Sequence, residues 1–278
     1  MRKIIGKRVG TCLLALSLLF TGSGMTAMAK TTLKRGADVE TKTGSIVLDG
    51  NDIRADNVNG LTYKGFGMLS GNSTSDLLLD YKTQNPEKYA ELMQYLFGGE
   101  YPIFTHVKLE MGNDRNNSTG PESATMRTKG ESANVMRNPG WQIAADAKKI
   151  NPKVKVSILS WNTPTWVTTT EEKYYWYKQS ILAAYEKYGF MVDYINPNVN
   201  EKWNLRTDVA NTKSFASWIA AEDASTIPDA EALKLYHKIK LIVSDEANVV
   251  SDSVTRKLKS DADFMNAVDV VGYHYKTA

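Results

Sequence analysis

The chain has 278 residues, of which 42% are hydrophobic and 23% are charged, and its formal net charge is +3 at pH 7. The positive charge comes from its start: residues 1–29 carry four basic residues and no acidic one, which leaves 30 basic against 31 acidic residues, a net charge of −1. The composition therefore does not favour a nucleic-acid partner.

The first 29 residues have the order of a secretory signal peptide. A basic segment (residues 1–8) precedes an apolar run (13–20) that is too short to span a bilayer, and small residues follow at 27–29. We expect cleavage after Ala29, a secreted protein, and no transmembrane segment in the mature chain. The only cysteine, Cys12, lies in this segment, so the mature chain would have neither a disulfide nor a cysteine nucleophile. Residues 30–45 are predicted to form a polar leader. The length that remains fits one large domain or two small ones, and the elements described next favour one partial (β/α) barrel over 46–278.

Strand-like and helical runs alternate from there to the end. Strands are predicted over 61–69, 103–110, 154–161, 193–200, 240–244 and 268–273. Helices are predicted over 85–97, 141–150 and 170–188, the last capped by Thr170 and ended by Gly189, and near 212–221, 229–238 and 251–260. This alternation favours parallel strands with right-handed crossovers, hence a (β/α) barrel or a doubly wound sheet. No glycine-rich phosphate loop follows a strand, and no cofactor is predicted.

Polar and aromatic side chains gather where the predicted strands end. They are Glu110 and Asp114, Trp161 and Asn162, Asn200 and Glu201, Asp245 and Glu246, and His274. In a barrel these ends form one mouth, where active sites lie. Taken alone, Asn200-Glu201 fits an ordinary turn with a solvated carboxylate as well as it fits a catalytic site. The polar residues at the other strand ends favour a glycosidase acid/base beside an amide that binds a sugar hydroxyl.

The neighbouring residues each have a plainer alternative. The Trp161 ring is predicted to stack on a sugar, although it could belong to the core. Glu110 is expected to be a hydrogen-bonding partner, and Asp245 and Glu246 to be rim carboxylates or a helix cap rather than catalysts. The spacing of the three histidines does not indicate a metal site.

Several motifs in order resemble the galactosylceramidase family, glycoside hydrolase family 59. They are Gly65–Gly71, Leu77–Tyr81, Tyr95–Phe97, Val107–Gly112, Ser160–Pro164 with Trp166, Asn200-Glu201, and Val268–Tyr275. The resemblance implies a TIM (β/α)8-type barrel, here truncated after about the sixth strand. It also implies a retaining hydrolase that removes terminal β-linked galactose from galactolipids or glycans, so the expected partner is a carbohydrate or glycolipid.

The family's site residues can be placed by motif. Glu201 matches the acid/base, Asn200 the amide that contacts the sugar, and Trp161 the tryptophan of the galactose pocket. Ser118 falls where the family has a substrate-binding threonine, in a loop rewritten here over 116–121. Met68, Asn72 and Val199 also depart from the family pattern.

The resemblance places the nucleophile, a glutamate, on the seventh strand, and a substrate-binding arginine further on. Neither falls within residues 1–278, so we expect a fragment or truncated product that is inactive alone. Two alternatives stay open: a related enzyme that cleaves another β-glycoside, and a non-catalytic or vestigial carbohydrate-binding protein.

Overall fold

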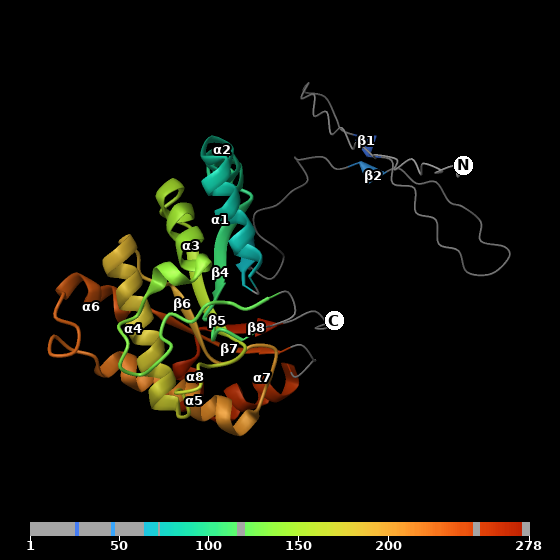
Figure 1. The fold of residues 1–278 in the computed structure, drawn as a ribbon. Helices are drawn as coiled ribbons and strands as arrows, with labels where there is room; N and C mark the ends of the chain where they lie inside the picture. The colour runs from blue at the N-terminus through green and yellow to red at the C-terminus, as the bar shows by residue number, and fades with distance from the viewer. Residues whose placement is uncertain are drawn as a thin grey trace, which may run out of the picture. The chain divides into compact units, whose positions relative to one another are not determined.

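The computed structural model describes residues 64–71, 73–115, 120–246 and 251–273, together with two short strands nearer the start (Figure 1). The chain divides into two units, Met1–Tyr63 and Lys64–Ala278. In the first unit β1 (Thr26–Ala27) pairs antiparallel with β2 (Ile46–Val47). Apart from these strands, the predicted signal peptide and leader lie outside the described residues.

A six-stranded parallel sheet forms the centre of the second unit. Its strands are β3 (Phe66–Ser70), β4 (Phe104–Glu110), β5 (Lys155–Ser160), β6 (Tyr194–Val199), β7 (Lys240–Glu246) and β8 (Val270–Tyr273). They lie side by side in chain order, β3-β4-β5-β6-β7-β8. A doubly wound sheet reverses its order at a switch point, whereas a barrel adds each strand next to the last. The order therefore confirms the barrel-type alternative.

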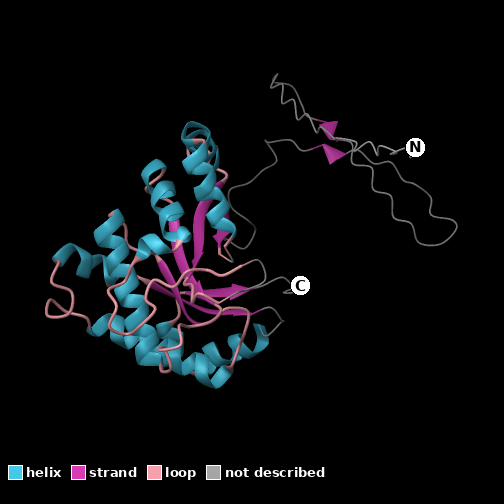
Figure 2. Ribbon diagram, in the orientation of Figure 1, coloured by secondary structure: helices cyan, strands magenta, loops and turns pink. Residues whose placement is uncertain are grey.

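Helices connect the strands and lie around the outer side of the sheet (Figures 1 and 2). They are α1 (Thr74–Gln84), α2 (Pro86–Phe97), α3 (Pro139–Ile150), α4 (Thr170–Tyr188), α5 (Leu205–Ala221), α6 (Ala230–Tyr236), α7 (Ser251–Ser260) and α8 (Ala262–Ala267), with a short 3-10 helix at Val135–Arg137. Two of them, α1 and α8, were not predicted. None of the described helices is long and apolar enough to cross a membrane.

A side-chain cap or a proline begins most of the described helices. Pro86 opens α2, and Gly189 ends α4, as predicted, in the left-handed conformation (φ 75°) that glycine adopts without strain. The predicted cap of α4 was wrong by one residue: the side chain of Thr169, not Thr170, accepts a hydrogen bond from the Glu172 amide. Thr170 is the first helical residue.

The two faces of the sheet have different surroundings, as β4 shows. Val107, Leu109 and Met111 are fully buried in the main core with the helices. The alternate residue Lys108 lies on the opposite face and forms an ion pair with Asp245 of β7. In a flat sheet β4 and β7 would be about 14 Å apart, more than the two side chains can bridge. The sheet is therefore curved, and this second face is the concave interior.

Candidate active site at the carboxyl ends of the strands

A register irregularity in β6 places Asn200 and Glu201. Ile158 of β5 pairs with Ile195 of β6, and Ser160 pairs with Val199. A step of two residues along β5 thus corresponds to a step of four residues along β6. The extra residues include Pro197, which cannot donate a ladder hydrogen bond and is tolerated at bulges. The bulge ends just before Asn200-Glu201.

Glu201 has a left-handed backbone (φ 61°), which costs a residue with a Cβ of order 1–2 kcal/mol. Its amide donates to the Asp245 carbonyl at 2.9 Å. Asp245 is itself left-handed (φ 60°) and is the extra residue of a second bulge, between Ser244 and Glu246 of β7. A Cβ on Gly272 of β8 would lie 3.2 Å from the backbone of Asp245, so glycine gives this bulge its space. The two strained turns thus brace each other.

The Asn200 side chain is buried among three polar groups. One end of its amide lies 2.7 Å from the Asp245 Oδ2 atom, and the other lies 3.2 Å from the Trp161 Nε1 atom. The amide therefore satisfies both contacts when its nitrogen donates to Asp245 and its oxygen accepts from Trp161. The Lys108 Nζ atom is 3.5 Å from the amide end that faces Asp245, too far to outweigh this arrangement.

Trp161 lies near the carboxyl ends of both β3 and β6. It follows β5, is partly exposed, and reaches Asn200 with its indole nitrogen. A Cβ on Gly71, just after β3, would lie 3.4 Å from the Trp161 ring and 3.0 Å from the Glu110 carboxylate. The absence of a side chain at Gly71 leaves room for both the ring and the buried Glu110.

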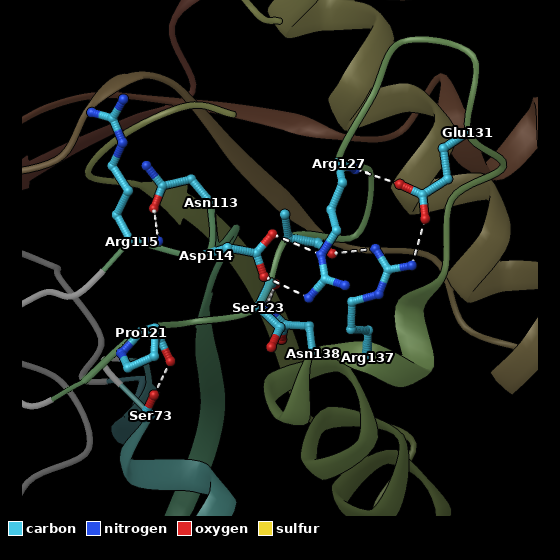
Figure 3. Close-up of polar contacts among 11 residues, drawn as sticks. Ser73, Asn113, Asp114, Arg115, Pro121, Ser123, Arg127, Glu131, Arg137 and Asn138 are labelled. Atoms are coloured by element: carbon cyan, nitrogen blue, oxygen red, sulfur yellow. Dashed lines mark hydrogen bonds and ion pairs between the residues drawn. The ribbon is translucent and has the colours of Figure 1, made fainter. Parts of the chain in front are cut away.

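The loop from β4 to α3 borders this mouth and is held by ion pairs (Figure 3). Arg127 donates two hydrogen bonds of 2.9 Å to the two carboxylate oxygens of Asp114, and this bidentate contact lowers the pKa of Asp114. The bond from Arg137 likewise lowers the pKa of Glu131, to which it donates at 2.5 Å. Ser118, the predicted substrate-binding residue of this loop, lies outside the described residues.

Glu122, in the same loop, is a buried carboxyl that the sequence did not single out. Its Oε2 atom accepts a hydrogen bond of 3.0 Å from the Ser73 amide, while its Oε1 atom is buried without a partner among the described residues. Burial raises the pKa of Glu122 to about 7, and the charges of Glu110 and Asp76 add to this effect.

The structure thus brings Asn200, Glu201 and Trp161 together. His274 lies outside the described residues, and Glu246 is described only as the last residue of β7. Lys108 was missed, although a lysine inside a predicted buried strand signals an inward-facing ion pair. Within the described part of the chain, no cluster of three or more histidine, cysteine or acidic residues could hold a metal ion.

The chain as a whole is similar to known proteins in sequence and in fold. Glycosyl hydrolase family 59 matches residues 63–278. Galactocerebrosidases from Mus musculus and Homo sapiens are 28% and 27% identical over 243 residues, 84% of this chain and 31% of each relative. A galactocerebrosidase from Danio rerio is 27% identical over 227 residues, 78% of this chain and 31% of the relative. The chain thus spans about a third of the length of the curated relatives it matches.

Among solved structures, an endo-β1,6-glucanase aligns with a TM-score of 0.57 at 17% identity, over 76% of this chain and 51% of its own. SrfJ from Salmonella typhimurium aligns at 0.54 with 13% identity, over 76% and 50%. At these identities the likeness concerns the fold.

Proposed function

Because the chain belongs to glycosyl hydrolase family 59, we propose that it is the acid/base-bearing part of a galactocerebrosidase-like enzyme that hydrolyses terminal β-galactosyl residues of galactolipids or glycans. The observation that carries the proposal is the position of Glu201 at the carboxyl end of β6, beside Asn200 and Trp161. Left-handed backbone at a site residue is the kind of strain that folds retain where function requires it.

In the proposed reaction Glu201 donates a proton to the glycosidic oxygen as the aglycone leaves. It then removes a proton from the water that releases the sugar. The Trp161 ring supplies an apolar face for the pyranose, and Asn200, fixed by Trp161 and Asp245, contacts a sugar hydroxyl.

Hydrolysis with retention of the anomeric configuration requires a second carboxylate about 5–5.5 Å from the acid. Asp245 is buried in contacts with Lys108 and Asn200, which supports a positioning role for its side chain rather than a nucleophilic one. We assign the nucleophile, by the family resemblance, to a strand outside residues 1–278.

Glu201→Gln tests the assignment in a form of the protein that continues beyond residue 278 and hydrolyses galactosides. Because the acid is lost, turnover of a galactolipid should fall about 10²–10⁴-fold. An aryl galactoside, whose leaving group needs no protonation, should keep more of its first-step rate. Glu87→Gln, an exposed change on α2, is the control. Unchanged galactolipid turnover by Glu201→Gln would refute the role.

Trp161→Ala in the same assay separates binding from proton transfer. Loss of the ring should weaken galactose binding by about 1–3 kcal/mol, while Trp161→Phe should keep most of it. A folded Trp161→Ala variant with unaltered galactose affinity would show that Trp161 is a core packing residue and does not bind the sugar.

We also propose secretion, on the basis of residues 1–29. N-terminal sequencing of the protein recovered from the culture medium should begin at Lys30. Retention of residues 1–29 on a cell-associated product would contradict this.

A further inference from the structure

A cavity of about 730 Å³ opens at the other end of the sheet, where the strands begin. It lies between the first residues of β5, β6 and β7 and the ends of α3 and α4. Its lining includes five lysines and a single acidic residue, Asp193; the lysines are Lys148, Lys149, Lys155, Lys238 and Lys240. Since the chain after residue 29 has a net charge of −1, this concentration is a local feature.

The acidic groups near the cavity do not balance its lysines. Lys155 and Lys148 share Asp193, with Nζ atoms 2.6 and 3.4 Å from its two oxygens. Lys238 and Lys240 make no ion pair with any described residue. Lys149 has a contact of 3.5 Å to Asp146, which the nearer Lys82 also shares. At neutral pH the cavity therefore carries excess positive charge.

Helix ends explain only some of these lysines. Lys148 and Lys149 lie in the last turn of α3, where cations offset the negative end of the helix dipole. Lys155 and Lys240 instead begin strands. Lys240 is the register partner of Tyr194, which itself pairs with Ser157, two residues after Lys155. These side chains therefore stand on the same face of the sheet.

The cavity also has an apolar wall. Phe190, Met191 and Val192 follow the left-handed Gly189 and are 7%, 8% and 3% exposed. Tyr188 lines the cavity too, and its buried hydroxyl has no hydrogen-bond partner among the described residues. Such a combination of an apolar wall with a few charged groups, at this volume, is typical of small-molecule sites.

We propose that this cavity binds a small organic phosphate or sulfate, with its anionic group at Lys238 and Lys240 and its apolar part against Phe190. The negative charge of the ligand, two for a phosphate ester and one for a sulfate ester at neutral pH, offsets charge that Asp193 leaves uncompensated, and lysine ammonium groups bind such anions as point charges. The site is independent of the proposed glycosidase function, because it lies at the opposite end of the strands from Glu201.

Calorimetric titration of the 278-residue chain with phenyl phosphate and with inorganic phosphate tests the proposal. Saturable binding is expected, tighter for phenyl phosphate because of the apolar wall. Lys238→Ala/Lys240→Ala should weaken it about a hundredfold, since each of the two lost charge-assisted hydrogen bonds is worth about tenfold. The matched control Lys88→Ala/Lys234→Ala removes the same charge at exposed helix positions outside the cavity, and its affinity should be unchanged.

Equal weakening in both double variants would mean a general charge effect and would overturn the site. No saturable binding to the native chain would also overturn it. Cosedimentation with phosphatidylglycerol vesicles separates a lipid surface from a small ligand, and binding to vesicles without binding to phenyl phosphate would refute the proposal. Circular dichroism of each variant checks that affinity is compared between folded proteins.

Discussion

At the scale of single residues, backbone strain coincides with the candidate site. Five described non-glycine residues have a left-handed φ: Ser73, Asp114, Glu201, Ser244 and Asp245. All five lie at or just after the carboxyl end of a strand. The main-chain hydrogen bond from Glu201 to Asp245 shows how two such residues can hold each other. Local sequence gives little warning of Glu201, because glutamate, unlike glycine, asparagine and aspartate, is not enriched in this conformation.

Glu122 gives the fold a pH dependence of known sign. Its pKa is raised to about 7 in the folded chain, from an ordinary value of 4.5. The folded state thus binds this proton more tightly than the unfolded state, and the stability it adds is present below pH 4.5 and lost as pH rises through about 7.

Glu122→Gln should remove this contribution. Between pH 4.5 and 7 the free energy of unfolding of the native chain should fall relative to that of the variant, by at most about 3 kcal/mol. Urea denaturation at several pH values measures the difference. Exposed Glu87→Gln is the control and should track the native chain at every pH. A constant difference between native chain and Glu122→Gln across this window would contradict the account.

At the scale of elements, the sequence predicted the type of most strands and helices but not their register. Apolar runs such as 154–161 indicate β5 because they are short and rich in β-branched residues. The bulge of β7 left no comparable signal, since pairing depends on neighbours distant in the chain. The bulge of β6 left one, Pro197 inside the predicted strand, but a proline does not specify the register. Helix α1 was missed because its apolar residues cluster at 77–79 instead of recurring with helical spacing.

The ion pair between β4 and β7 should matter more to stability than surface pairs do. Lys108→Met removes the ion pair between Lys108 and the Asp245 side chain, which is 5% exposed. Removing one partner of a buried pair usually costs about 3–5 kcal/mol, and the partial exposure of Lys108 reduces the expected loss to about 2–4 kcal/mol.

Two further variants test that prediction by urea denaturation. Lys108→Met/Asp245→Asn removes both charges and should recover much of the loss. Lys129→Met breaks the exposed pair with Glu172 and should cost less than about 1 kcal/mol. If Lys108→Met and Lys129→Met lower the free energy of unfolding equally, the ion pair between Lys108 and Asp245 stabilises the fold no more than an exposed pair does.

At the scale of the whole molecule, chain order explains why the mouth was predictable and the basic cavity was not. Parallel strands bring all their carboxyl ends to one edge, so polar residues that follow strands could be grouped from sequence alone. The lysines of the cavity come from helix ends, loops and strand starts between 148 and 240, where solvated lysines are ordinary. Only the three-dimensional arrangement shows that they converge.

The described sheet has two edge strands, β3 and β8. Leu69 of β3 is the register partner of Lys108, so it lies on the concave face, and it is 46% exposed. Open edges with exposed apolar side chains pair readily with other chains. We therefore expect residues 30–278, expressed alone, to self-associate. We also expect them to show no hydrolysis of an aryl β-galactoside, because the proposed nucleophile lies outside them.

The variant Leu69→Lys tests the edge. It should lower the apparent mass in gel filtration with light scattering, since an edge lysine opposes strand pairing. Leu77→Lys, the same change at a 74% exposed position on α1, should not. A monomeric, active product would instead make Asp245 the first residue to test as nucleophile.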